Sequence, residues 1–210
     1  MSLHTLALDL GYVGATLGVA MVVPQIVRTV RHPTLGGVSP VAWSMTVIAC
    51  TTWLIYGIRT ATIQQIPGNI LLVSGAICVV LLVPSAVSRR QRAVTLGAAL
   101  LALVVVAFAV PPHSVGYLAV AIGLTSAWPQ VYDSVATWRA GVRSGVSLTT
   151  WTLRAASQMC WLTYALTAAD VPVAISSTVA LSTAMTLLAL ESLAPMRGAR
   201  LGAALQPETV

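Results

Sequence analysis

Two segments of this chain repeat the same residues at matching positions. Each contains a Pro-Gln pair, a Val-Ser pair, a single tryptophan and a Trp-Leu-x-Tyr group. These groups begin at Pro24, Val38, Trp43 and Trp53 in the first copy, and at Pro129, Val146, Trp151 and Trp161 in the second. The copies are offset by 105 residues at the Pro-Gln pair and by 108 residues from the Val-Ser pair onward, which places a length difference in one loop. A repeat of about half the chain predicts a fold made of two similar halves.

The composition predicts that most of the chain lies in a membrane. Of its 210 residues, 57% are hydrophobic and 8% are charged, whereas about a quarter of the residues in a soluble domain are charged. A helix needs about 20 apolar residues to cross a bilayer, and seven such runs are present. They cover roughly residues 10–29, 40–59, 66–85, 93–111, 114–134, 147–168 and 171–192. We therefore predict an all-α integral membrane protein with seven transmembrane helices.

The repeat indicates how the seven helices are grouped. Each copy accounts for three spans, and the span at 93–111 has no counterpart in either copy. A single linking helix gives both groups the same direction across the membrane, which is a parallel repeat. We therefore predict a 3-1-3 arrangement of two parallel three-helix-bundle repeats joined by a linker helix. The expected units are a first repeat at 1–88, the linker helix at 89–112, a second repeat at 113–194 and a loose cytoplasmic tail at 195–210.

The arginines indicate the orientation of the chain. The net charge is +6, and the sequence contains no lysine. Most of the arginines follow the odd-numbered spans, whereas Arg59 is the one arginine in the loops of the opposite side. Because basic loops stay in the cytoplasm, we expect the N-terminus outside, the C-terminus in the cytoplasm and a location in the plasma membrane, the inner membrane of a bacterium. No soluble module presents these arginines to bases, which argues against nucleic acid as a partner.

Three segments of the chain resemble a known family of membrane transporters. They are PQIVRTVRHPTLGGVSPVAW, WLIYGIRTATIQQIPGN and WPQVYDSVATWRAGVRSGVSLTTW. With these segments the chain resembles the PQ-loop superfamily, and within it the SWEET and SemiSWEET sugar transporters, whose seven-helix members have the 3-1-3 arrangement. The resemblance covers nearly the whole chain apart from the linker helix and the tail. It implies facilitated diffusion of a mono- or disaccharide by alternating access, with a solute site between the two halves.

Trp53 and Asn69 are the main candidates for solute binding. They lie sixteen residues apart and resemble the Trp and Asn that bind sugar in SemiSWEETs. A tryptophan offers an apolar face to the C–H surface of a sugar ring, and an amide offers a donor and an acceptor to hydroxyl groups. In the second repeat Ser177 follows Trp161 by sixteen residues, where the family usually has Asn, whereas alignment on the neighbouring prolines places Ala174 there. We expect an asymmetric site completed by Trp161 and one of these two residues.

The two Pro-Gln pairs are predicted to form hinges or gates. A proline within a helix removes one donor and clashes with the carbonyl four residues back. Prolines in membrane helices also serve ordinary packing, but their repetition at matching positions favours a hinge. Pro24 and Pro129 are the expected hinge positions. Gln25 and Gln130 either bond the freed backbone groups or line a cytoplasmic gate.

Four charged residues are candidates for gating or proton coupling. Asp133 lies near the cytoplasmic end of the fifth span, and Arg154 lies one to two turns inside the sixth. A charge at this depth needs a partner, so we predict an ion pair that either clamps these two helices or acts as a proton-linked gate. Arg59 and Asp170 occupy equivalent loops at the other side, where they either form an external gate pair or remain solvated loop charges.

Two further features are assigned to packing and to the membrane interface. Gly14 and Gly18 form a small-xxx-small pattern that permits close helix contact, and we expect it to pack the first three-helix bundle. Trp43 and Trp151 lie near the cytoplasmic ends of their spans, where tryptophans form interfacial belts.

Three functions remain in view. The leading prediction is a transporter that moves a small polar solute, with a sugar favoured, by facilitated diffusion. The alternative is a proton-coupled amino-acid transporter similar to cystinosin, which would use Asp133, and the third is a cargo or retention-signal receptor. No catalytic motif supports an enzyme, and no cysteine spacing suggests a metal site. We expect no cofactor, and the expected partners are the solute and membrane lipid, with a homo-oligomer left open.

Overall fold

The computed structural model describes residues 3–31, 40–139 and 148–204. These ranges contain seven helices and no strand: α1 (Leu3–Arg31), α2 (Pro40–Arg59), α3 (Gln65–Leu82), α4 (Arg89–Ala109), α5 (Pro112–Arg139), α6 (Leu148–Ala168) and α7 (Val171–Ala204). Each helix covers one of the predicted spans, so the all-helical prediction is confirmed. α7 is longer than expected, because it continues into the segment at 195–210 that was predicted to be a loose tail. The alanine, leucine and arginine residues of this stretch favour helix.

Five of the described helices are long and apolar enough to cross a membrane. The candidate spans are Thr5–Pro24, Val41–Arg59, Gln65–Leu82, Arg89–Ala109 and Val171–Leu190. α6 has a similar length but is more polar, since it contains Arg154, Ser157, Gln158 and several threonines. These three named side chains line an internal cavity. The lower apolarity of α6 therefore reflects the face that it turns toward the interior of the protein.

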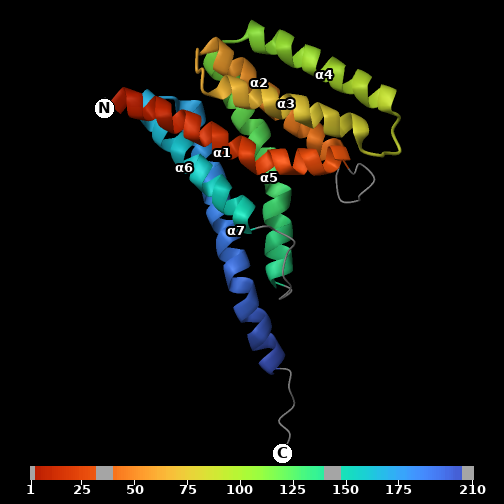
Figure 1. Ribbon diagram of the computed structural model, residues 1–210, viewed down its shortest axis with the longest axis vertical. Helices are drawn as coiled ribbons and strands as arrows, with labels where there is room; N and C mark the ends of the chain where they lie inside the picture. Colours follow the sequence, from red (N-terminus) through yellow and green to blue (C-terminus); the bar gives the residue numbers. More distant parts are fainter. Residues whose placement is uncertain (1–2, 32–39, 140–147, 205–210) are drawn as a thin grey trace, which may run out of the picture.

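The helices form two groups with the same internal order. α3 packs against both α1 and α2, and α7 packs against both α5 and α6. We call α1–α3 the first bundle and α5–α7 the second bundle. The bundles meet where α1 packs against α6 and where α2 packs against α5, and these two contacts are equivalent because the repeats pair α1 with α5 and α2 with α6. α4 lies on the outside of the first bundle, against α2 and α3 (Figure 1).

The turns that join α2 to α3 and α6 to α7 share an uncommon backbone conformation. Ala61 and Ala169 have φ angles of 56° and 53°. They are separated by the same 108 residues as the repeated tryptophans. The left-handed region is uncommon for a residue that has a Cβ atom, so its presence at both equivalent positions is structural evidence for the repeat. Both turns lie at one end of the molecule, which we call the turn end, and the two bundles diverge away from it (Figure 1).

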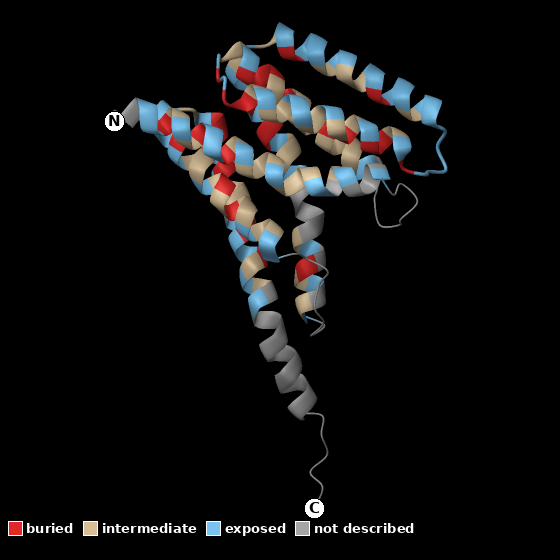
Figure 2. Ribbon diagram, viewed as in Figure 1, coloured by how far each residue is buried: buried red, intermediate tan, exposed pale blue. Residues whose placement is uncertain are grey.

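The larger core cluster joins the two bundles near the turn end. It includes Ile55 and Tyr56 of α2, Val115 of α5, Tyr164 of α6 and Val173 of α7. Buried residues gather where helices touch, and much of the outer surface consists of exposed apolar residues (Figure 2). A thin core with an apolar exterior suits a bundle in lipid, because lipid tails are as apolar as the packed side chains.

Arg59 binds α4 and has no contact of its own with Asp170 among the described interactions. Its Nη1 atom donates hydrogen bonds to the carbonyl oxygens of Ala107 and Val110, the latter over 2.5 Å. Arg92, at the start of α4, donates in the same way to two carbonyls at the end of α3. Carbonyls at helix ends lack intrahelical partners, so these arginines act as caps that fix α4 to the first bundle. The predicted external pair of Arg59 and Asp170 is therefore replaced by separate partners for each residue.

The Gly14–Gly18 pattern packs α1 against α6 of the second bundle. The expectation that it packs the first bundle is therefore wrong. A Cβ atom at Gly14 would lie 3.0 Å from Cδ1 of Trp161, and one at Gly18 would lie 3.6 Å from Oγ of Ser157. The Ser157 hydroxyl also donates a hydrogen bond of 2.8 Å to the Gly14 carbonyl. The missing side chains thus allow α1 to approach α6. The sequence pattern shows that a close contact exists but does not identify the partner helix.

Gly116 of α5 lies at a crowded position near the turn end, between Pro172 of its own bundle and Tyr56 of the other bundle. Its substitution should destabilise the protein. A Cβ atom there would lie 2.7 Å from Cβ of Pro172 and 2.8 Å from Cε2 of Tyr56. We expect Gly116→Ala to lower the free energy of unfolding by about 1–3 kcal/mol, because the crowded backbone and ring must move apart. Thermal unfolding of the detergent-purified protein measures this change.

Gly123→Ala is the matched control for this prediction. Gly123 lies on the same helix, and a Cβ atom there would meet nothing within 4 Å. Alanine is the better helix former, so this variant should be as stable as the wild type or slightly more stable. Equal unfolding temperatures for the two variants would contradict the assigned role of Gly116.

Candidate solute-binding cavity

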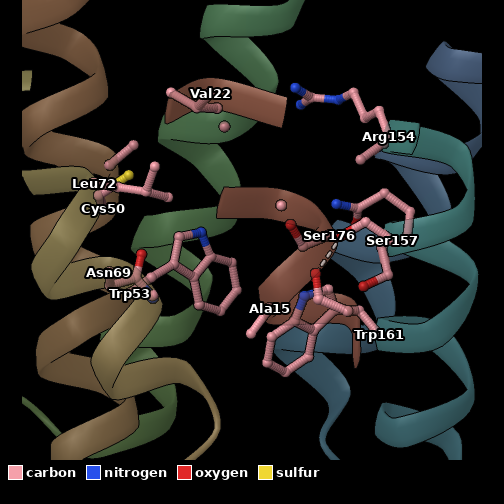
Figure 3. A pocket seen from close by; sticks show the side chains of 18 of the residues that line it. Ala15, Val22, Cys50, Trp53, Asn69, Leu72, Arg154, Ser157, Trp161 and Ser176 are labelled. Carbon is pink, nitrogen blue, oxygen red and sulfur yellow. Dashed lines mark hydrogen bonds between the residues drawn. The ribbon is translucent and has the colours of Figure 1, made fainter. Parts of the chain in front are cut away.

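A cavity of about 720 Å³ lies between the two bundles. Its lining residues come from α1, α2 and α3 of the first bundle and from α5, α6 and α7 of the second, and α4 contributes none of them. Figure 3 shows side chains from both bundles pointing into the same space. The volume is within the range of small-molecule sites, which is roughly 300–1,000 Å³.

The lining residues occur in pairs that the repeat relates. At the same 108-residue offset, both members of several pairs line the cavity. These pairs include Thr46 and Arg154, Cys50 and Gln158, Trp53 and Trp161, Gln65 and Val173, Gly68 and Ser176, Asn69 and Ser177, and Leu72 and Ala180. The cavity therefore lies where the two repeats face each other, with the same positions of both copies around it.

Trp53 and Trp161 are held by matching aromatic contacts. The ring of Trp53 is edge-on to Tyr56, with centroids 5.7 Å apart and an interplanar angle of 82°. The ring of Trp161 is edge-on to Tyr164 at 5.6 Å and 90°. Edge-to-face pairs of this kind are favourable and orient both rings. Both tryptophans line the cavity, so their faces are available to a solute (Figure 3).

Asn69 also lines the cavity, on α3 beside Trp53 (Figure 3). Its amide nitrogen donates a hydrogen bond of 2.8 Å to the backbone carbonyl of Gln65. This bond fixes the amide plane and leaves the amide oxygen and the second N–H for a solute. In the second bundle Ser177 lines the cavity, whereas Ala174 packs against the core cluster. Of the two residues considered for this position, Ser177 is thus the one placed beside the cavity.

Several cavity residues were not identified from the sequence. Gln65 is 4% exposed, and its Oε1 atom has no hydrogen-bond partner among the described residues. Ser176 lines the cavity next to Ser177, and Trp43, expected in an interfacial belt, lines it as well. Trp43 is part of the repeated pattern, so the repeat itself was a usable signal for it. Gln65 belongs to no repeated motif, since its equivalent in the second copy is Val173.

Arg154 is a charged residue at the cavity wall. Its Cζ atom lies 5.3 Å from the ring centroid of Trp151, a cation–π contact within the same helix. Its Nε atom is buried and has no hydrogen-bond partner among the described residues. The predicted ion pair with Asp133 stays a prediction, because the side chain of Asp133 lies outside the described residues.

The cavity ends before the turn end, where polar contacts join the bundles. The Tyr56 hydroxyl of α2 donates a hydrogen bond of 2.6 Å to Oδ1 of Asp170, which precedes α7. The same carboxylate oxygen accepts a bond of 3.2 Å from the amide nitrogen of Val173. The residues at the equivalent positions of the other copy are Tyr164 and Thr62. Asp170 therefore takes part in a contact across the bundles, with Tyr56 in the place expected for Arg59.

The hinge and metal predictions can be compared with the structure only in part. α1 continues through Pro24, which is exposed and does not line the cavity. The side chains of Gln25, Pro129 and Gln130 lie outside the described residues. In the described ranges, no group of three or more histidine, cysteine, aspartate or glutamate side chains is placed to hold a metal ion.

The fold has been observed before in a solved structure. The chain aligns with "The 3.7 A resolution structure of a eukaryotic SWEET transporter" with a TM-score of 0.78 and 14% sequence identity, over 92% of this chain and 99% of that one. No family model matches the chain, and no curated protein matches it at a significant level. At this identity the likeness shows the fold alone. The protein thus has, over nearly its whole length, the fold of a SWEET transporter.

Proposed function

We propose that the protein is a membrane transporter that moves a small polar solute, a mono- or disaccharide type of molecule, by facilitated diffusion with alternating access. The observation that carries this proposal is a cavity lined by equivalent residues of both repeats and closed at one end by contacts between them. A site shared by two similar bundles is typical of transporters built from repeats. The aligned structure is that of a SWEET transporter, which agrees with this proposal.

The proposed architecture has seven membrane spans in a 3-1-3 arrangement. The helix contacts support it, because α1–α3 and α5–α7 have the same packing order and α4 lies outside both. The arginines at the end of α1, the start of α4 and the end of α5 place most of the positive charge at the end opposite the turns. By the positive-inside rule that end faces the cytoplasm and the turn end faces outward.

The proposed solute site uses the aromatic faces of Trp53 and Trp161, the amide of Asn69 and the hydroxyl of Ser177. Tryptophan faces suit the C–H surfaces of a sugar ring, and amide and hydroxyl groups suit its hydroxyls. The Oε1 atom of Gln65, which has no hydrogen-bond partner in the described ranges, adds a further acceptor beside the cavity. Hydrogen bonds inside a cavity are specific because unpaired buried groups are costly.

In the proposed cycle the described state is closed at the outer end and widens toward the cytoplasmic end. Opening the outer end requires loss of the Tyr56–Asp170 hydrogen bond and separation of the core around it. Pro24 and Pro129 are the proposed hinges, since each interrupts the hydrogen bonding of the first helix of its bundle.

The solute site is tested by Trp53→Ala and Asn69→Ala. We expect each to lower solute counterflow in liposomes by about tenfold, because each removes roughly 1–2 kcal/mol of stacking or hydrogen bonding. Leu101→Ala, at an exposed position of α4, is the control and should retain wild-type counterflow. Facilitated diffusion also requires that uptake does not follow an imposed pH gradient. Wild-type counterflow in both site variants would show that the solute binds elsewhere.

The closure of the outer end is tested by Tyr56→Phe. The change removes a hydrogen bond of about 1 kcal/mol and should raise the population of outward-open protein about fivefold. Cys50 lines the cavity and reports this opening when Cys78 and Cys160 are replaced by alanine. We expect faster modification of Cys50 by a membrane-impermeant thiol reagent added from outside.

Tyr12→Phe provides the control for this labelling experiment, because Tyr12 is exposed on α1 and does not line the cavity. In Tyr12→Phe the rate of Cys50 modification should equal that in the parent protein. An unchanged rate for Tyr56→Phe as well would argue that the Tyr56–Asp170 bond does not hold the outer end closed.

A further inference from the structure

Arg154 gives the cavity a positive charge that a neutral sugar does not require. It is the one charged residue among the described residues that line the cavity. Its equivalent in the first repeat is Thr46, which lines the same cavity without a charge. The two walls therefore match in their tryptophans and differ in charge.

The guanidinium of Arg154 is placed to bind an anion. The Cζ atom lies over the ring of Trp151, 5.3 Å from its centroid, and the N–H donors lie along the edges of the planar group. Figure 3 shows these edges directed from α6 into the space between the bundles. The Nε atom is buried and has no partner in the described parts of the chain. A guanidinium offers paired N–H donors in the geometry of a carboxylate or a phosphate.

The neighbouring side chains define what else such an anion would carry. Gln158 lines the cavity one turn after Arg154 on α6. Ser176 lines it on the same side as Arg154, and Trp53 and Asn69 lie across from them (Figure 3). These groups suit a hydroxylated ring, and none of them carries a charge. An unpaired charge within a membrane protein is costly, and a single aromatic contact offsets only part of that cost.

We propose that the solute carries an oxyanion, a carboxylate or a phosphate, which pairs with Arg154 while its hydroxylated body lies between Trp53 and Trp161. The substrate class is thus a sugar acid or a sugar phosphate. This inference rests on the proposed function as a transporter, and it identifies the solute class of the same cavity.

Thermal unfolding of the detergent-purified protein tests the proposal without transport. Glucuronate, glucose 6-phosphate and glucose serve as probes of matched size in a buffer free of phosphate. We expect one of the two oxyanions to raise the unfolding temperature of the wild type well above the effect of glucose. The same oxyanion should raise the unfolding temperature of Arg154→Lys to a smaller extent. Arg154→Met should lose this shift. Comparison of the shifts caused by glucuronate and by glucose 6-phosphate shows whether the solute carries a carboxylate or a phosphate.

Arg139→Gln is the matched control, because Arg139 is an exposed arginine in the last turn of α5 and does not line the cavity. It should keep the full shift with the oxyanion. A shift that survives in Arg154→Met, or equal shifts with glucose and both oxyanions in the wild type, would overturn the proposal. So would the lack of any shift with either oxyanion.

The stability of the empty variants separates an anion site from a structural ion pair with Asp133. If Arg154 is unpaired without solute, Arg154→Met removes a buried charge and should raise the unfolding temperature by about 3 °C. If Arg154 and Asp133 form a fixed pair, Arg154→Met and Asp133→Asn should both lower it. A fall in both variants would overturn the proposal.

Charged thiol reagents give a second measurement that does not depend on choosing the right solute. In the Cys78→Ala, Cys160→Ala background, the cavity thiol is Cys50. Compared with their rates toward a free thiol in solution, an anionic methanethiosulfonate should be favoured over a cationic one at Cys50, and Arg154→Met should reduce the ratio of anionic to cationic rates by about tenfold. An unchanged ratio would show that the charge of Arg154 does not act in the cavity.

Liposome counterflow distinguishes failure of this inference from failure of the proposed function. Counterflow of glucose with no preference for either oxyanion would support the transporter and overturn the anion assignment. Oxyanion-specific thermal shifts that depend on Arg154, without counterflow of any probe, would support the anion site and contradict transport.

Discussion

The contact between the two bundles at the turn end is the constraint on which the rest of the structure depends. Gly116 allows α5 to approach Tyr56 and Pro172, and Tyr56 then reaches Asp170 across the interface. Because the bundles are held most closely at this end, they diverge beyond it, and the cavity lies in the widening space. A hydrogen bond contributes about 1 kcal/mol net, a small part of the roughly 5–15 kcal/mol that stabilises a fold. A contact of this size can open without unfolding either bundle.

Duplication determines where the cavity lies, and divergence between the copies determines what it can distinguish. Trp53 and Trp161 keep the same aromatic partners and nearly the same geometry in both bundles. The pairs Asn69 with Ser177 and Thr46 with Arg154 differ in chemistry. A fully symmetric cavity would bind a solute equally well in two orientations related by the repeat. Differences on one wall therefore select one orientation, so the asymmetry is a source of specificity.

The sequence was sufficient to predict the helices and part of the cavity, because both depend on periodic or repeated features. The seven apolar runs located the helices, and the repeated tryptophans located two walls of the cavity. The partners of Gly14, Arg59 and Asp170 depend on which helices approach each other, and an apolar pattern does not specify this. Tyr56 could be singled out from the sequence as a candidate residue, since it belongs to the repeated Trp-Leu-x-Tyr group, but its bond with Asp170 could not be predicted. Gln65 could not be singled out in this way, since its equivalent in the second copy is an apolar valine.

If the solute carries the proposed oxyanion, the charge of Arg154 would link solute binding to conformational change. An arginine within a membrane helix costs up to about 3 kcal/mol on insertion scales, and an aromatic contact returns about 0.5–1 kcal/mol. In the described state the widening cavity lets water reduce this cost. Closing the cytoplasmic end would remove that water, so the cost rises in an empty closed state unless an anion replaces the water. An oxyanion bound to Arg154 would thus lower the free energy of the closed intermediate, so that the loaded carrier passes between its two open states faster than the empty carrier.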